Sequence, residues 1–281
     1  MITRLLTWIS FCLLIAACRK NDDGGNIHTE GRFIRLISHN GYNVNVFFDA
    51  PQTDTVDVIM TFHGTVMYDS LIINAAETSV DMVKGITDRN DILYAGVAYP
   101  EEGLLMGDNV AYAEAALLWM KEEGERTLGK KIRKIFLVGH SQGGYVVTRL
   151  NCMHPTDGVV ANGPGPLNLV LRCQLEESGQ IASGITCSLL KQTYGSVYDN
   201  PDAYKARSLL MFTNQFKGDI LFVQGMQDSQ IQMTSWPFFK QKLDSCTSCM
   251  DIQIQEEANY GHTALFDSPQ ADSVYNIFIN R

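Results

Sequence analysis

The sequence lacks an excess of positive charge, a hydrophobic run of membrane-spanning length and any internal repeat. It has 22 Lys and Arg residues against 31 Asp and Glu residues, which gives a net charge of −9. Such a surface offers little to a phosphate backbone, so we expect no binding of nucleic acid. The 281 residues are 45% hydrophobic and 19% charged, a composition that argues against disordered and low-complexity architectures. A chain of this length can bury its own core, commonly as a single α/β domain.

Motifs that mark common cofactor sites are also missing. The sequence contains no H-E-x-x-H zinc motif, no G-x-G-x-x-G after a strand and no P-loop. We therefore expect neither a metal ion nor an organic cofactor. Nothing in the sequence indicates an oligomeric state.

The longest apolar run lies close to the N-terminus. Residues 5–17 are 13 uncharged, mostly apolar residues that follow Arg4. This run is too short for a bilayer, which needs about 20 residues, but it suits the core of a signal peptide. It ends in Ile15-Ala16-Ala17-Cys18, which resembles the lipobox of bacterial lipoproteins. The resemblance implies cleavage before Cys18, acylation of Cys18 and a lipid anchor in the outer membrane. An ordinary secretory signal cleaved after Ala17, with an incidental Cys18, is the alternative.

The segment after the cleavage site is polar. Residues 18–31 contain glycine and charged residues, which is typical of a flexible tether. Within it, Lys20-Asn21-Asp22-Asp23 resembles a bacterial surface-export signal, although a solvated linker explains the charges equally well. We expect a signal peptide at 1–17, a tether at 18–31 and one folded domain at 32–281, on either the periplasmic or the outer side of the membrane.

The remaining cysteines fit an exported protein, because oxidising compartments favour disulfides. Cys173 with Cys187 and Cys246 with Cys249 are the pairs closest in sequence, which leaves Cys152 over. The sequence does not fix the connectivity. The C-x-x-C at 246–249 is also compatible with a redox motif or half a zinc site. Because no second cysteine pair follows it, we favour a structural disulfide within a loop.

Strand and helix patterns alternate along the rest of the chain. Residues 32–38 and 42–49 predict a hairpin around Asn40-Gly41. We expect further strands at 57–62, 91–99, 133–138, 158–161, 219–223 and 252–255, and helices at 110–123, 143–153, 235–244 and 270–280. The alternation predicts one α/β domain whose mostly parallel sheet is flanked by helices. About 50 residues at 167–216 separate two strands and predict an inserted helical cap.

The chemistry gathers around one glycine-rich turn. Gly139-His140-Ser141-Gln142-Gly143-Gly144 follows the strand 133–138 and precedes a helix, which is the setting that a G-x-S-x-G nucleophile elbow requires. The glycines allow a strained turn that presents the Ser141 hydroxyl, and the helix N-terminus favours developing negative charge. A serine also needs a base and a group that orients the base. A glycine-rich turn with no catalytic role is the alternative.

These residues resemble the α/β-hydrolase family, in which nucleophile, acid and histidine follow one another in that order. Of the six histidines, His262 lies late, in a loop before the final helix. Asp228 follows the strand 219–223 in a Gly-x-x-Asp pattern. The resemblance implies that His262 is the base and that Asp228 orients it. Asp251 and Asp267 are weaker candidates for the acid.

The resemblance extends to His63-Gly64-Thr65, which ends the strand 57–62 and is similar to the family's HG loop. It implies that the backbone N–H groups of Thr65 and Gln142 form the oxyanion hole, while His63 has a structural role. The additional glycines of the HGGG branch are missing.

The resemblance implies a serine carboxylic-ester hydrolase that works through an acyl-enzyme, on small esters or extracellular polysaccharide esters. A serine peptidase of the prolyl-oligopeptidase branch shares the elbow and the triad order. A lipoprotein that keeps the fold as a binding module is the third interpretation. Six aromatic residues in or after the cap could line an acyl pocket or simply pack in the core: Tyr194, Tyr198, Tyr204, Trp236, Phe238 and Phe239.

Overall fold

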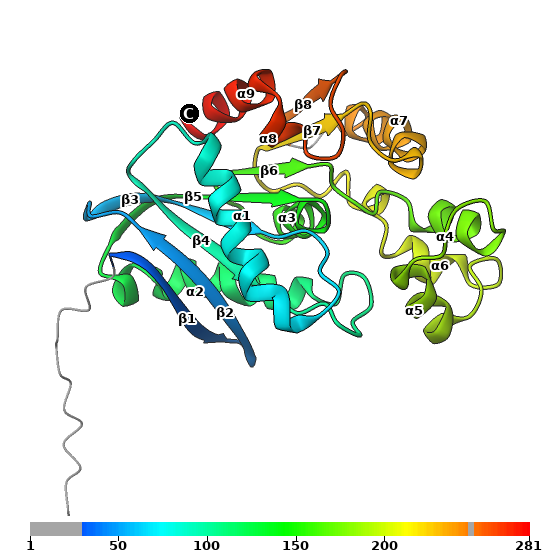
Figure 1. Cartoon of the computed structure of the whole chain (residues 1–281), viewed down its shortest axis with the longest axis horizontal. Helices are drawn as coiled ribbons and strands as arrows, with labels where there is room; N and C mark the ends of the chain where they lie inside the picture. Colours follow the sequence, from blue (N-terminus) through cyan, green and yellow to red (C-terminus); the bar gives the residue numbers. More distant parts are fainter. Residues whose placement is uncertain (1–29, 247–249) are drawn as a thin grey trace, which may run out of the picture.

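The computed structural model describes residues 30–246 and 250–281. The expected signal peptide, Cys18, Cys249 and nearly all of the tether lie outside the described residues. An eight-stranded sheet in the order β1-β2-β4-β3-β5-β6-β7-β8 runs through the domain (Figure 1). Within the described part of the chain, no helix has both the length and the apolar character needed to cross a membrane.

The strands and helices follow the predicted alternation. The strands are β1 (Gly31–His39), β2 (Tyr42–Ala50), β3 (Thr55–Phe62), β4 (Ile92–Ala98), β5 (Lys131–His140), β6 (Gly158–Asn162), β7 (Ile220–Gly225) and β8 (Ile252–Glu257). The α-helices are α1 (Ile72–Ile86), α2 (Val110–Leu128), α3 (Gln142–Met153), α4 (Leu169–Glu177), α5 (Ile185–Tyr194), α6 (Pro201–Lys205), α7 (Gln230–Asp244), α8 (Ala264–Asp267) and α9 (Pro269–Ile279). Two short 3₁₀ helices are η1 (Asp69–Leu71) and η2 (Leu209–Met211).

The antiparallel start of the sheet is confirmed. β1 pairs antiparallel with β2, and β2 pairs antiparallel with β4. The turn between β1 and β2 contains Asn40 at φ 48° and Gly41 at φ 83°, the left-handed pair that a tight hairpin turn requires. From β4 to β8 every neighbouring pair is parallel, so the carboxyl ends of these strands meet at one edge.

Each face of the sheet carries a hydrophobic core. Val58 and Met60 pack with α2 and α3 on one face, whereas Ile59 between them packs with α1, α8 and α9 on the other. Side chains alternate along a strand, so a strand covered on both faces needs an unbroken apolar run. This explains why the apolar runs of β3 to β7 predicted a mostly parallel, helix-flanked sheet, which is confirmed.

Two helices differ from the expectation. The pattern assigned no element to residues 72–86, where α1 lies, because its buried face consists of small side chains at Ala76, Val80 and Val83. α1 also approaches the sheet closely, since a Cβ on Gly96 would lie 2.4 Å from the Ala76 carbonyl oxygen. α7 begins at Gln230 rather than Ser235, because its first turn is too polar to show a helical pattern.

The segment between β6 and β7 contains α4, α5 and α6, which lie beyond the carboxyl ends of the central strands (Figure 1). A disulfide joins Cys173 on α4 to Cys187 on α5, and both residues are buried. Cys152 carries a free thiol. The second expected pair involves Cys249 and so lies outside the described residues.

Replacement of Cys173 and Cys187 by alanine should lower the free energy of unfolding by up to about 3 kcal/mol, because the disulfide restricts the unfolded chain across a loop of roughly 15 residues. Urea unfolding without reductant measures the difference. Dithiothreitol should destabilise the wild type more than the double variant. Equal stability of the two proteins without reductant would contradict the prediction.

Candidate active site

Ser141 lies in the sharp turn between β5 and α3, with φ 56° and ψ −118°. A non-glycine residue in this region is strained and must be held there by its surroundings. The surroundings are tight: a Cβ on Gly139 would lie 2.1 Å from the Gly143 oxygen, and a Cβ on Gly143 would lie 1.9 Å from the Phe62 oxygen. Both positions therefore require glycine, and the turn holds Ser141 at the carboxyl edge of the sheet.

The backbone of Ser141 is anchored on both sides. Its N–H donates to the Asn162 carbonyl at 2.9 Å, and its own carbonyl accepts from the Gly165 N–H at 3.2 Å. Ser141 is also the N-cap of α3, so it lies at the positive end of the helix dipole. These contacts fix the backbone that carries the hydroxyl.

Asp228 and His262 come from loops after the neighbouring parallel strands β7 and β8. These loops touch, since a Cβ on Gly225 would lie 1.9 Å from the Gly261 oxygen. The contact brings together two residues that are 34 positions apart: His262 Nδ1 and Asp228 Oδ2 form a hydrogen bond of 2.7 Å. Of the weaker candidates, Asp251 directly precedes β8 and Asp267 ends α8, and their carboxylates have other partners.

The carboxylate of Asp228 is fully engaged. Oδ2 also accepts from Gln224 Nε2 at 3.2 Å, Oδ1 accepts from the Ser229 N–H at 2.6 Å, and the side chain is only 3% exposed. Burial would raise the pKa of Asp228, but the hydrogen bonds and the charge of His262 hold it below its usual value. An ionised Asp228 accepts the Nδ1 proton of His262, which leaves Nε2 as the nitrogen available to a substrate.

A cleft of about 340 Å³ opens at this edge of the sheet. Its walls include four of the predicted residues, namely Thr65, Ser141, Gln142 and His262. Asp228 contacts His262 from outside these walls. Three residues of the cap segment, Asn168, Arg172 and Thr186, also line the cleft.

Thr65 and Gln142 lie side by side at the cleft. The HG loop passes directly by the nucleophile, since a Cβ on Gly64 would lie 3.4 Å from Ser141 Cβ. Thr65 Oγ1 donates to Gln142 Oε1 at 2.7 Å, which fixes the two residues relative to each other. Gln142 is the first residue of α3, so its N–H has no intrahelical acceptor. The two residues expected to donate to an oxyanion therefore lie together at the cleft beside Ser141.

His63 is a buried packing residue. Its ring stacks on Tyr99 with centroids 4.1 Å apart, and its Nδ1 donates to the Gly64 carbonyl at 2.8 Å. Burial lowers the pKa of His63 to about 4, although its hydrogen bonds with Gly64 and Tyr99 oppose the change. A neutral imidazole here supports the HG loop through these contacts.

The sequence interpretation missed Asn162, the last residue of β6. Its side chain is fully buried, Nδ2 donates to the His262 carbonyl at 3.1 Å and to His140 Nδ1 at 2.8 Å, and Oδ1 accepts from the Leu265 N–H at 3.1 Å. Together with the bond from Ser141, these contacts tie the nucleophile turn to the histidine loop. The only signal in the sequence is a polar residue at the end of an apolar strand.

His140 contacts both Asn162 and His262. Its ring centroid lies 4.8 Å from that of His262. Burial, with a further contribution from His262, lowers the pKa of His140 to about 4. A neutral His140 accepts the hydrogen bond from Asn162 and places no second positive charge beside His262.

The aromatic residues of the cap region pack mainly in the core. Tyr204, Trp236 and Phe239 are buried, whereas Tyr198 and Phe238 are exposed. Tyr194 packs against the main core. The cleft wall formed by α7 consists of Ile231, Gln232 and Ser235.

Within residues 30–246 and 250–281, no three His, Cys, Asp or Glu side chains gather closely enough to hold a metal ion.

Asn162→Ala should lower the free energy of unfolding by about 1–3 kcal/mol, because it leaves the buried Leu265 N–H and the His262 carbonyl without their partner. Urea unfolding measures the loss. Asn280→Ala is the matched control, since the Asn280 side chain bonds to Asp88 at an exposed position and its loss should change stability by no more than about 0.5 kcal/mol. Equal losses in the two variants would contradict a central role for Asn162.

No protein-family model and no curated protein matches the sequence. Several solved structures are similar to it. Acylaminoacyl peptidase of Pyrococcus horikoshii has a TM-score of 0.63 and 12% identity, over 90% of this chain and 42% of the peptidase. An esterase of Pyrococcus furiosus has a TM-score of 0.64 and 14% identity, over 90% of this chain and 92% of the esterase. A fungal esterase from Rhizomucor miehei has a TM-score of 0.63 and 12% identity, over 89% of this chain and 82% of the esterase.

This chain thus spans less than half of the peptidase and most of each esterase. At these identities the similarity concerns the fold alone. It agrees with the strand order and with the parallel arrangement from β4 to β8. The chain therefore has the α/β-hydrolase fold that its sequence predicts.

Proposed function

We propose that the protein is a serine hydrolase of carboxylic esters, with Ser141, His262 and Asp228 as its catalytic residues. The observation that carries the proposal is the 2.7 Å hydrogen bond between Asp228 and His262, at a cleft that both His262 and the strained Ser141 line. Burial, strain and an oriented base concentrated at one point are typical of a nucleophilic active site.

The geometry supports a two-step acyl transfer. Ser141 Oγ attacks the ester carbonyl while His262 Nε2 takes its proton, and the ionised Asp228 stabilises the imidazolium. The N–H groups of Thr65 and Gln142 bind the oxyanion. His262 then returns the proton to the leaving alcohol, which gives an acyl-enzyme. Water, deprotonated by His262, releases the acid and restores Ser141.

The comparisons favour an ester over a peptide bond as the substrate. The similarity spans most of two esterases but only 42% of the acylaminoacyl peptidase. A serine peptidase is the second candidate, because the acylaminoacyl peptidase shares this fold. A binding lipoprotein without turnover is less favoured, because the Asp228–His262 pair and the elbow are intact.

The N-terminal sequence supports a proposal about location. A lipidated Cys18 would anchor the enzyme in the outer membrane, with the tether 18–31 between lipid and domain. The substrates would then be small esters or polysaccharide esters outside the inner membrane. This part of the proposal rests on the lipobox-like sequence at 15–18.

Ser141→Ala should lower kcat/KM for p-nitrophenyl acetate, butyrate and octanoate by roughly 10⁴-fold or more, because it removes the nucleophile. Ser273→Ala, on the exposed face of α9, is the control and should retain activity. Turnover that survives in Ser141→Ala would exclude Ser141 as the nucleophile. If the wild type were inactive on all three esters, a serine peptidase would become the favoured function, followed by a binding protein without turnover.

Asp228→Asn should lower kcat by up to roughly 10⁴-fold with a smaller effect on KM, because an amide cannot hold His262 in the required tautomer or stabilise its cation. Steady-state kinetics on the best ester of the series measure both constants. Asp244→Asn, at the exposed end of α7, removes the same charge away from the site. A similar kcat in Asp228→Asn and Asp244→Asn would rule out Asp228 as the orienting acid.

A further inference from the structure

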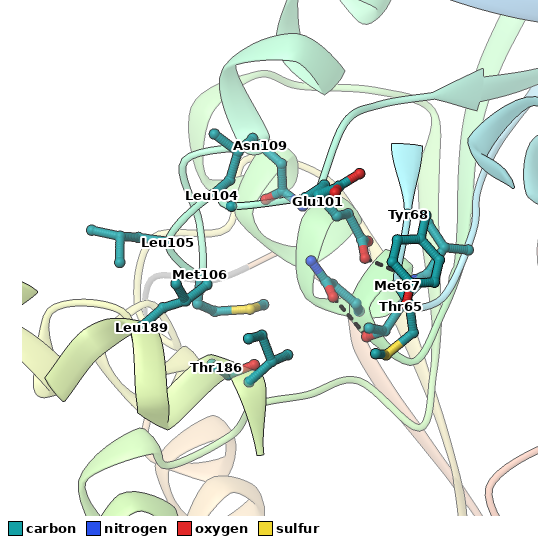
Figure 2. Close-up of a pocket in the computed structure, with 15 residues that line it drawn as sticks. Thr65, Met67, Tyr68, Glu101, Leu104, Leu105, Met106, Asn109, Thr186 and Leu189 are labelled. Carbon is teal, nitrogen blue, oxygen red and sulfur yellow. Dashed lines mark hydrogen bonds between the residues drawn. The ribbon is translucent and has the colours of Figure 1, made fainter. Parts of the chain in front are cut away.

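Figure 2 shows a second cavity, of about 270 Å³, which shares part of its lining with the cleft around Ser141. Its walls come from the HG loop, the loop before α2 and helix α5 of the cap. Thr65, Met106, Gln142 and Thr186 line both the cavity and the cleft. The two spaces are therefore neighbours on either side of the predicted oxyanion donors.

Most of this second cavity is apolar. Leu104, Leu105, Met106 and Leu189 form much of its wall, as Figure 2 shows. Met67 and Tyr68, which also line it, are 65% and 55% exposed. Exposed large apolar side chains at the rim of a cavity are typical of a surface that receives a hydrocarbon group.

Two acceptors in the same walls have no partner. Glu101 Oε2 accepts from the Val66 N–H at 2.8 Å, but Glu101 Oε1 is buried without a hydrogen-bond partner among the described residues. Asn109 is 2% exposed, and its Oδ1 is likewise buried and unpartnered within the described chain. Unsatisfied buried acceptors are uncommon and costly, so a ligand that donates hydrogen bonds to them would stabilise this wall.

These walls also carry carboxyl groups. Glu101 and Glu102 line the cavity, and Asp69 at the start of η1 accepts from their N–H groups through Oδ1 at 2.9 and 3.0 Å. Burial raises the pKa of Glu101 to about 8, with a smaller contribution from Asp69 and an opposing one from the Val66 N–H. A cation is the ligand that complements a desolvated carboxylate with acidic neighbours.

We propose that this cavity is a substrate subsite for a primary ammonium group at the end of an aliphatic chain. Glu101 is the counter-ion of the ammonium, Asn109 Oδ1 is a second acceptor, and the leucine and methionine side chains contact the hydrocarbon. The inference rests on the proposed function and names its substrate class, which is esters that carry a basic aliphatic chain.

A purely structural role for Glu101 makes a different prediction. Its hydrogen bond with Val66 holds the HG loop, and any acceptor at this position could do the same. Glu101→Gln keeps an oxygen for the Val66 N–H but removes the charge. If Glu101 only holds the loop, the substitution leaves the discrimination between an amine and its uncharged analogue unaltered.

Titration calorimetry with n-hexylammonium chloride and 1-hexanol tests the proposal on the whole protein, without any need for turnover. At pH 8.5 the wild type should bind the ammonium at least about tenfold more tightly than the alcohol, the range expected for a charge-assisted hydrogen bond. Glu101→Gln should bring the two affinities to about the same value. Glu122→Gln is the matched control: it removes a surface carboxylate further along α2 and should keep the preference.

The preference for the ammonium over the alcohol should change with pH in one direction. Glu101 ionises as the pH rises through about 8, while an alkylammonium stays protonated to about pH 10. The preference for the ammonium should therefore increase from pH 6 to pH 9 in the wild type and stay flat in Glu101→Gln. Leu189→Trp, which fills the cavity, should weaken binding of both probes and provides a second variant if Glu101→Gln does not fold.

Competition separates this inference from the proposed function. Hexylammonium should inhibit hydrolysis of p-nitrophenyl butyrate competitively, because the cavity adjoins the cleft. Equal binding of both probes by an active esterase, or an unchanged preference in Glu101→Gln, would overturn the subsite. Selective ammonium binding by a protein with no esterase activity would overturn the proposed function and leave the subsite standing.

Discussion

The close backbone contact between Gly143 and Phe62 is the constraint on which the rest of the site depends. With a Cβ position only 1.9 Å from the Phe62 oxygen, the start of α3 lies directly against the end of β3. The same contact brings the HG loop to Ser141 and places Thr65 beside Gln142. The positions of the proposed nucleophile and of the proposed oxyanion donors therefore follow from one packing requirement, which glycine alone satisfies.

The histidine side of the site depends on hydrogen bonds rather than on close packing. Asn162 connects the backbone of Ser141 to that of His262, and Asp228 holds the imidazole ring from the next strand. The side chains of Asn162 and Asp228 are 0% and 3% exposed, so the lower dielectric around them strengthens their hydrogen bonds and makes an unpaired group costly. The rigid sheet therefore sets the backbone positions, and the buried polar side chains set the orientation of the base.

The features that the sequence predicts are those with a local signature. The strands of the central sheet are apolar runs, the elbow is a run of glycines around Ser141, and Asp228 and His262 each follow a strand. α1 was not predicted, because its buried face carries only the small side chains Ala76, Val80 and Val83 and so gives no clear helical pattern of large hydrophobic residues. Asn162 and Glu101 owe their importance to burial and to partners distant in sequence, which no local pattern encodes.

The position of Glu101 has a consequence for catalysis as well as for recognition. The Thr65–Gln142 hydrogen bond joins two residues that line both the cleft and the second cavity. A substrate that fills both spaces must run past the oxyanion donors, so an ammonium held at Glu101 limits where its carbonyl can lie. Binding energy from a remote group then contributes to orientation at Ser141, and such a contribution appears in kcat as well as in KM. In this proposal the acidic wall and the oxyanion donors are linked through Val66, whose N–H bonds to Glu101 and which directly follows Thr65.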